Sequence, residues 1–202
     1  SKEMRKLDGH DDVIPGRIFS AVTFIGKAHK LNFEHFHNAR VETEFAFRLK
    51  VDIPSLEDPV VASDLKNKVT MHPAVEIIGN RHQLHYATKS EKSLMTIADN
   101  GGGIGFVFGN KFDHWENLNF QEHYISLKVN GNPSAENFLG EMRCKPLDAV
   151  VDLINHLSTR KIYLKKGDFI STGAATVPQP FFKNSSVIAD FGIIGKIKLT
   201  FI

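Results

Sequence analysis

Two glutamates that stand two positions apart in an apolar segment are the first residues of this chain that suggest chemistry. Glu42 and Glu44 lie in Val-Glu-Thr-Glu-Phe-Ala-Phe, residues 41–47, which is rich in β-branched and aromatic side chains. In a strand, alternate side chains share a face, so the two glutamates point one way and the larger apolar residues point the other way, toward a core. Two carboxylates on one face repel each other unless water screens them or a cation neutralises them. The pair indicates either a strand whose polar face meets solvent, the commoner explanation of an isolated Glu-x-Glu, or a site for a hard divalent cation such as Mg²⁺.

A third carboxylate follows in a second apolar segment. Glu76 lies in Pro-Ala-Val-Glu-Ile-Ile-Gly, residues 73–79, which predicts another strand. Val75 and Ile77 share one face of that strand, and Glu76 faces the other way. A lone charged side chain in so apolar a run is expensive to bury unless it is paired or coordinates a cation. Glu76 therefore becomes the third carboxylate to consider.

The ten histidines of the chain invite a second metal hypothesis, because His29, His35 and His37 stand just before the glutamate pair. Their spacing matches no zinc motif, and no cysteine cluster accompanies them. His35 and His37 share a face only if the segment is extended. We therefore expect histidines of the surface or of loops here.

Composition indicates an ordinary globular protein. The 202 residues fit a single domain, 1–202, with 42% hydrophobic and 24% charged residues. A formal charge of +2, carried by scattered lysines and arginines, gives no nucleic-acid footprint. The single Cys144 excludes an internal disulfide framework and suits a reducing compartment. Because no apolar run is long enough to span a bilayer and the start has no signal-peptide pattern, we expect a cytoplasmic protein that binds neither nucleic acid nor membrane.

Hydrophobic periodicity predicts many strands and few helices, which is typical of an α+β fold with a mostly antiparallel or mixed sheet. Pro146 suits the first turn of the clearest helix, whose apolar stripe predicts core packing. Residues 80–96 are polar and without clear periodicity, and we expect a mobile loop that can include a helical turn. Asn130 and Gly131 predict a hairpin-type turn. The expected helices are 63–69 and 146–158, with a short polar segment that can form a helix near the start of the chain; the expected strands are 18–25, 41–51, 73–79, 124–129, 169–174, 186–190 and 196–202.

A glycine-rich segment, residues 98–109, lies between these elements. No strand pattern precedes it and no helix pattern follows it, so it does not open a dinucleotide-binding unit. Its glycines more readily permit a close approach of the backbone to a ligand or to another strand.

The order of these motifs resembles the fumarylacetoacetate hydrolase superfamily, in the branch of 2-keto-4-pentenoate hydratases and 4-oxalocrotonate decarboxylases. The resemblance runs through nearly the whole chain, over the segments 40–47, 73–81, 98–100, 145–150 and 167–174. It implies a mixed β-sheet roll or barrel with a few flanking helices. It also implies that Glu42, Glu44 and Glu76 hold one Mg²⁺ or Mn²⁺, which chelates a 2-oxo acid and stabilises an enolate.

The chain also departs from the pattern of these relatives. They carry a Lys-Ile-Gly element and a longer helical region that would precede Ser1, and an acidic residue near 14–16 that is absent here. A glycine stands here where relatives have a small polar residue after Ala-Asp-Asn-Ala, and Met95 stands where relatives can have an aspartate. Lys145 replaces a histidine, and we assign it no role. The metal ligands are thus retained, while the groups for proton transfer are sparse.

Four further residues are candidates for the substrate pocket. Thr172 matches a position that lines the pocket in the family, where its hydroxyl could meet a substrate carboxylate; alternatively it only ends a strand. Asn100 and Asp99 border the site or form a plain turn. Arg81 neutralises a substrate carboxylate, pairs with Glu76, or lies on the surface.

Three functions compete for this chain. The first is a metal-dependent hydratase that acts on a small 2-hydroxydienoate or 2-oxo acid, with a 4-oxalocrotonate-type decarboxylase as its alternative. The second is a catalytically impaired homologue that serves as a partner subunit or binding protein, since hydratases and decarboxylases of this branch associate. The third is hydrolysis of an acylpyruvate, which needs a water-activating base. We expect a homo-oligomer, or a complex with a related decarboxylase or hydratase.

Overall fold

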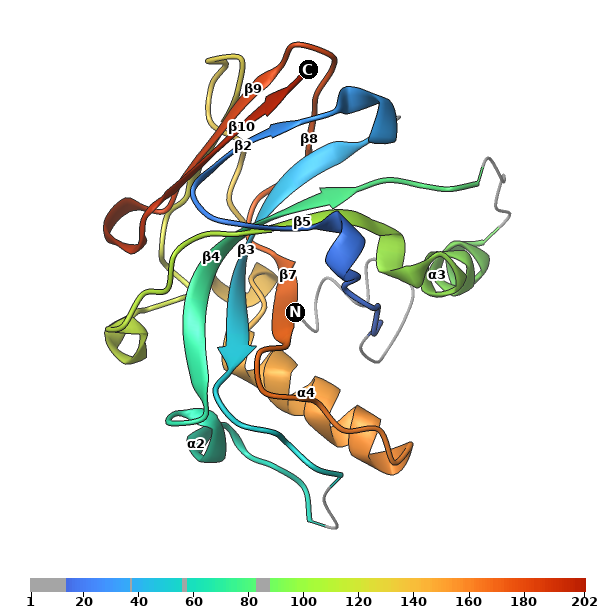
Figure 1. The fold of residues 1–202 in the computed structure, drawn as a ribbon, viewed down its shortest axis with the longest axis vertical. Coiled ribbons are helices and arrows are strands. Elements are labelled where there is room, and N and C mark those ends of the chain that lie inside the picture. Colours follow the sequence, from blue (N-terminus) through green and yellow to red (C-terminus); the bar gives the residue numbers. More distant parts are fainter. Residues whose placement is uncertain (1–13, 37, 56–57, 83–87) are drawn as a thin grey trace.

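Two β-sheets carry the fold in the computed structural model, which describes residues 14–36, 38–55, 58–82 and 88–202 (Figure 1). In the larger sheet of the described residues the strand order is β1-β5-β4-β3-β7, and β8 also pairs with β3. The β1–β5 pair is parallel and the other pairs of this sheet are antiparallel. The strands are β1 Thr23–Ile25, β3 Arg40–Leu49, β4 Val69–Ile78, β5 Gly103–Phe108, β7 Phe169–Ala174 and β8 Gln179–Pro180.

The smaller sheet has the order β2-β10-β9-β6, with a parallel β2–β10 pair and antiparallel pairs elsewhere. Its strands are β2 Ala28–Leu31, β6 Ser126–Val129, β9 Ser186–Asp190 and β10 Lys196–Phe201. Apolar residues of both sheets form the main core, where side chains such as Phe45, Phe47, Ile77, Leu127, Ile197 and Phe201 are fully buried. Mixed sheets with few helices confirm the α+β class, and in the described part of the chain the two sheets do not close into a barrel.

Three α-helices flank the larger sheet within the described residues: α2 Ala62–Leu65, α3 Lys89–Ala98 and α4 Pro146–Thr159. Short 3₁₀ turns connect the elements at Ser20–Val22, Phe33–His35, Asn100–Gly102, Trp115–Asn117, Gly140–Met142 and Gly192–Ile194. Helix α4 confirms the predicted helix, since proline begins it and Val150 and Ile154 are buried. In the part of the chain that the structure describes, no helix is long and apolar enough to cross a bilayer.

Several expected boundaries were wrong. The strand with Glu42 and Glu44 ends at Leu49 rather than near Val51, and residues 20–22 form a 3₁₀ turn, so only Thr23–Ile25 of the expected segment 18–25 is a strand. Strand β6 begins at Ser126, later than expected. Asn130 and Gly131 form the predicted turn with φ angles of 53° and 74°, although β6 pairs with the distant β9.

Strand β4 begins at Val69, four residues before the expected start at Pro73, and the expected helix 63–69 shortens to Ala62–Leu65. Pro73 lies inside the ladder, opposite Phe45. It has no N–H to donate, but its carbonyl accepts a hydrogen bond from the N–H of Gly109 at 2.8 Å. The missing N–H of proline therefore does not end this strand.

The expected loop over residues 80–96 was also wrong in its second half, which belongs to helix α3. Thr88 caps the helix, since its side chain accepts from the N–H of Glu91 at 3.1 Å and the Glu91 carboxylate accepts from the N–H of Thr88 at 3.1 Å. This capping box was the overlooked signal. Residues 83–87 and the predicted helical segment near the start of the chain lie outside the described residues.

Candidate metal centre

Three glutamates meet on the two central strands of the larger sheet. Glu42 and Glu44 lie on β3, and Glu76 lies on β4 directly opposite Glu42. One carboxylate oxygen of each lies within 4.8 Å of the other two. The alternation that the sequence predicted therefore brings all three carboxylates to one face of the sheet.

This face does not simply meet solvent. Glu42 is 7% exposed and Glu44 is 1% exposed. Next to them along the strands, Ala46 and Ala74 are buried under the rings of Phe106 and Phe108. Glu76 is half-buried beside the other two glutamates. Water therefore screens this group less than it screens glutamates of the surface.

The pKa of Glu76 is raised by this arrangement. Burial raises the pKa of the Glu76 carboxyl well above its ordinary value, and the charges of Glu44 and Glu42, together with a hydrogen bond to Glu44, raise it further. A divalent cation among the three oxygens would reverse this effect, because it favours the ionised form of each ligand. Three hard oxygen donors without a thiolate or imidazole fit Mg²⁺ or Mn²⁺.

Strand β7 supports Glu44 from the side. The hydroxyl of Ser171 and the backbone N–H of Gly173, at 2.9 Å, both donate to Glu44 Oε2. Neither residue was a candidate from the sequence, because β7 is more than 120 positions away and its register on β3 was not predictable.

Strand β5 passes close over Glu76. A Cβ atom at Gly103 would lie 2.6 Å from Glu76 Oε1 and 2.6 Å from the ring of Phe106. A Cβ at Gly105 would instead meet Ile77 and Phe36 at 3.0 Å, on the opposite face. The prediction that the glycines of this segment permit close approach to a neighbouring strand is therefore confirmed by these two contacts.

Arg81 forms an ion pair with Asp99 rather than with Glu76. Its guanidinium donates to the Asp99 carboxylate at 2.9 Å and to the Gly103 carbonyl at 2.8 Å. Partial burial raises the pKa of Asp99, but hydrogen bonds from the backbone and side chain of Arg81 outweigh it, so the pKa lies below its ordinary value. The Arg81 side chain remains 48% exposed.

Asn100 uses its side chain to hold an earlier segment. Its amide oxygen accepts from the Arg17 N–H at 2.7 Å, and its amide nitrogen donates to the Arg17 carbonyl at 2.9 Å. Its backbone φ of 57° lies in the left-handed region, which agrees with the alternative that this stretch is a turn.

Thr172 is 7% exposed, and its hydroxyl donates to the Phe45 carbonyl at 2.6 Å. A substrate carboxylate would compete with that carbonyl for the hydroxyl proton. The substrate roles of Thr172, Asn100 and Arg81 stay predictions.

Of the histidines before the glutamates, His29 lies on β2 and His35 lies in an exposed 3₁₀ turn, and neither belongs to this group. His37 lies outside the described residues. A residue that sequence reasoning missed is His72, which alternation places on the same face of β4 as Glu76. It is 7% exposed, and its ring nitrogens contact the Gly109 carbonyl at 2.8 Å and the Thr70 hydroxyl at 3.2 Å. Burial lowers the pKa of His72, so the neutral imidazole is favoured.

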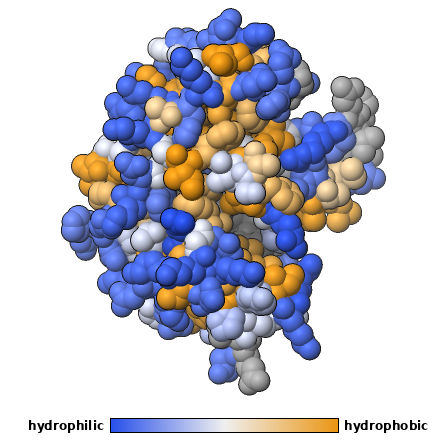
Figure 2. All heavy atoms as spheres, viewed as in Figure 1, coloured by the Kyte–Doolittle hydropathy of each residue, from blue (hydrophilic) through white to orange (hydrophobic). Residues whose placement is uncertain are grey.

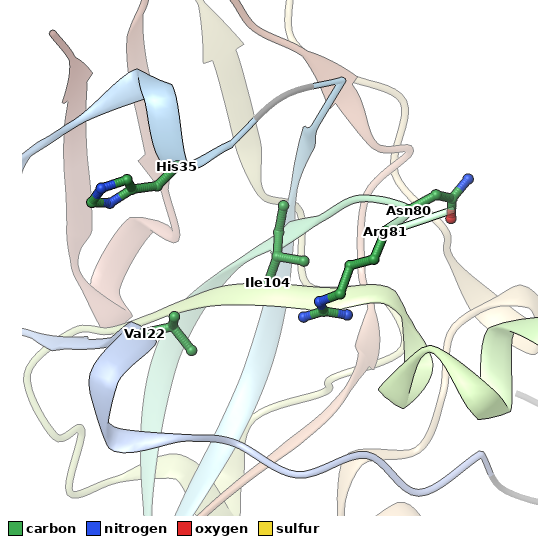
Figure 3. A pocket seen from close by; sticks show the side chains of 5 residues that line it. All are labelled: Val22, His35, Asn80, Arg81 and Ile104. Carbon is green, nitrogen blue, oxygen red and sulfur yellow. The ribbon is translucent and has the colours of Figure 1, made fainter. Parts of the chain in front are cut away.

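A cavity of about 340 Å³ lies beside this region, between β5, the end of β4 and two 3₁₀ turns (Figure 3). Its lining residues are Val22, His35, Asn80, Arg81 and Ile104. Figure 3 shows the Arg81 side chain reaching across to β5, where its guanidinium donates to the Gly103 carbonyl at 2.8 Å. On the face drawn in Figure 2, apolar side chains gather around a hollow in the middle of the molecule.

Comparison with known proteins gives one curated relative in sequence. The chain is 26% identical over 175 residues to the 2-oxo-hept-4-ene-1,7-dioate hydratase of Escherichia coli, which covers 84% of this chain. The chain spans 64% of the length of that relative. No protein-family model matches the chain.

Solved structures share the fold. Two structures of a 4-oxalocrotonate decarboxylase from Pseudomonas putida G7 match 100% of this chain and 74% of their own, at 19% identity. Their TM-scores are 0.83 for the complex with calcium and acetate and 0.82 for the complex with magnesium and adipate. A Yersinia pestis CO92 protein described as belonging to the fumarylacetoacetate hydrolase family has a TM-score of 0.58 at 12% identity, over 90% of this chain and 80% of its own. The resemblance to this superfamily, in its hydratase and decarboxylase branch, is confirmed.

Proposed function

We propose that this chain binds one Mg²⁺ or Mn²⁺ through Glu42, Glu44 and Glu76 and acts as a metal-dependent hydratase on a small 2-hydroxydienoate or 2-oxo acid. The observation that carries the proposal is the convergence of three carboxylate oxygens within 4.8 Å on β3 and β4, two of them from the buried Glu42 and Glu44 and one from the half-buried Glu76. Three negative charges held this close in an apolar enclosure are stable only with a proton or a cation among them. The named activity of the Escherichia coli relative supports the choice of reaction.

The residues of the chain divide into those that hold the cation and those that meet the substrate. When bound, the cation supplies Lewis-acid polarisation of the oxygens of a 2-oxo acid. Arg81 is the best placed of the predicted substrate residues, because it is partly exposed and lines the cavity next to β5. The Thr172 hydroxyl donates to the Phe45 carbonyl and the Asn100 side chain binds the backbone of Arg17, so each would have to exchange its present partner to meet a substrate.

Decarboxylation is the second candidate, because the structures that match 100% of this chain are those of a 4-oxalocrotonate decarboxylase. Both reactions use a 2-oxo acid or its dienol and the same cation site. The proposal includes a homo-oligomer or a complex with a related decarboxylase or hydratase, in the cytoplasm, where the free thiol of Cys144 remains reduced.

The test combines metal binding with turnover. Calorimetric titration with Mg²⁺ and Mn²⁺ should give saturable binding to the wild-type chain and none to Glu76→Ala. Glu116→Ala serves as the matched control, since Glu116 is exposed in the 3₁₀ turn Trp115–Asn117. Turnover of 2-hydroxypenta-2,4-dienoate distinguishes the reactions, because hydration adds water across a double bond whereas decarboxylation of 4-oxalocrotonate releases CO₂. Absence of binding in the wild type would rule out the site, and binding without turnover would favour the partner-subunit function.

A further inference from the structure

Strand β7 carries an irregularity where it meets Glu44. The register pairs Glu44 with Ala174 and Ala46 with Ser171, so one residue lies between the partners on β3 and two lie between them on β7. Gly173 in this bulge has a φ of 106°, in the left-handed region that favours glycine. The extra residue sits beside the candidate metal centre.

The hydrogen bonds around the bulge are rearranged around the carboxylate. The Ala175 N–H donates to the Thr43 carbonyl at 2.7 Å, as in a regular ladder. The next β3 carbonyl, that of Phe45, accepts from the Thr172 hydroxyl. The Gly173 N–H is thereby released from the ladder and donates to Glu44 Oε2 at 2.9 Å. The Thr172 hydroxyl thus satisfies the Phe45 carbonyl in place of a backbone N–H, while the Gly173 N–H binds Glu44.

Two donors converge on one oxygen of Glu44, because the Ser171 hydroxyl also donates to Oε2. Charge-assisted hydrogen bonds of this kind fix the carboxylate in one orientation. The other oxygen, Oε1, is then left for a cation. Such a carboxylate serves as a ligand through a single oxygen, which suits the small octahedral Mg²⁺ better than the larger Ca²⁺, which readily takes both oxygens.

From this geometry we propose that Ser171 and Gly173 are positioning residues for the metal ligand Glu44 and bias the centre toward Mg²⁺ over Ca²⁺. The inference rests on the proposed function, because it assumes that Glu44 binds the cation. Partners in the outer shell of a metal site orient its ligands, and their removal costs about 10- to 100-fold in metal affinity. Gly173 contributes through its backbone, so Ser171 is the residue that a substitution can test.

The experiment titrates Mg²⁺ and Ca²⁺ into the substrate-free chain by calorimetry, for the wild type, Ser171→Ala and Ser171→Thr. Thr70→Ala is the matched control, since Thr70 is equally half-buried on the same sheet and its hydroxyl contacts His72 and a backbone carbonyl instead of a glutamate. We expect Ser171→Ala to weaken Mg²⁺ binding about tenfold and Ca²⁺ binding less, which narrows the preference for Mg²⁺. Ser171→Thr, which keeps the hydroxyl, should restore most of the affinity, and Thr70→Ala should leave both affinities unchanged.

The outcomes separate this inference from the proposed function. If the wild type binds Mg²⁺ and Ser171→Ala binds it equally well, or if Thr70→Ala loses as much affinity, the positioning role is wrong while the metal site stands. If the wild type binds neither cation, the metal site fails and the inference fails with it. A wild type that binds Mg²⁺ without turnover leaves the positioning role testable by the same titrations, which need no substrate.

Discussion

Two clusters of polar side chains lie on either side of Gly103, and they differ in whether their charges are balanced. On one side, Arg81 and Asp99 form an ion pair, and the guanidinium also binds the Gly103 carbonyl. On the other side, Glu42, Glu44 and Glu76 bring three carboxylates together. The first cluster pairs one positive with one negative charge, whereas the three carboxylates of the second have charges of one sign, which protons or a cation would offset.

The pKa directions express the same difference. Partial burial opposes the ionisation of Asp99, but Arg81 more than compensates, so its pKa is lowered. Burial also opposes the ionisation of Glu76, but its neighbours Glu44 and Glu42 add to the effect, so its pKa is raised. A cluster whose members satisfy one another stabilises the fold, while like charges held together in a partly buried place are the pattern expected of a ligand site.

The largest effect on metal binding is expected from Glu76→Gln. This change keeps the shape of the side chain and removes one of three like charges. We expect the metal-free variant to be more stable than the wild type by about 1–2 kcal/mol, a rise in Tm of roughly 2–8 °C. Added Mg²⁺ should raise the Tm of the wild type and leave that of the variant unchanged. Thermal unfolding in EDTA measures the stability without metal, and thermal unfolding in Mg²⁺ measures the rise in Tm on binding. A metal-free variant that is less stable than the wild type would show that the three carboxylates do not destabilise one another.

The pH dependence of stability should differ between the same two proteins. The pKa of Glu76 is higher in the folded chain than its ordinary value of 4.5, so the folded state binds a proton more tightly than the unfolded state. The stability that this proton contributes is complete below pH 4.5 and is lost as the pH rises toward the pKa of the folded state. The metal-free wild type should therefore lose stability relative to Glu76→Gln as the pH rises above 4.5, at up to about 1.4 kcal/mol per pH unit. Urea unfolding in EDTA across this range measures the difference. Parallel curves for the two proteins would contradict the raised pKa.

Gly103→Ala should sharpen the comparison, because this residue separates the two clusters. Its Cβ would lie 2.6 Å from Glu76 Oε1, and its φ is not in the left-handed region, so the effect is purely steric. Overpacking of this kind costs about 1–3 kcal/mol. Gly105→Ala is the control, because it overpacks the other face of β5 against Ile77. We expect both variants to lose stability in urea unfolding, while only Gly103→Ala weakens Mg²⁺ binding in calorimetry, by about tenfold. Equal Mg²⁺ affinities for the two variants would show that β5 does not constrain Glu76.

Local pattern was sufficient to predict part of this site and could not predict the rest. Alternation placed Glu42 and Glu44 on one face, and a lone charge in an apolar run pointed to Glu76. The resemblance then implied that the three act together, and the register of β3 with β4 brings Glu76 opposite Glu42. Ser171 and Gly173 were missed because they depend on a bulge in a pairing between segments more than 120 positions apart, and such non-local register has no local signature.

The pairing of Arg81 with Asp99 was not predicted for a related reason. Asp99 was expected to border the site or form a turn, and the ion pair requires the end of β4 to lie beside the end of helix α3. That helix was itself expected to be a loop, although Thr88 and Glu91 gave a local signal for its start.

The smallest effect is expected from Asp99→Asn, which breaks the balanced cluster. Arg81 is 48% exposed, so solvent screens the ion pair and its loss should cost no more than about 1 kcal/mol, or roughly 2–4 °C in Tm. Because the pKa of Asp99 is lowered in the folded chain, the ion pair stabilises the fold fully above the ordinary pKa of 3.8. This stabilisation is lost as the pH falls through the pKa of the folded state, where the free energies of unfolding of wild type and variant should become equal. Mg²⁺ affinity should not change, because Asp99 contacts none of the three glutamates. A large loss of Mg²⁺ binding in Asp99→Asn would show that the two clusters act as one site, with Arg81 transmitting the charge of Asp99 across Gly103 to Glu76.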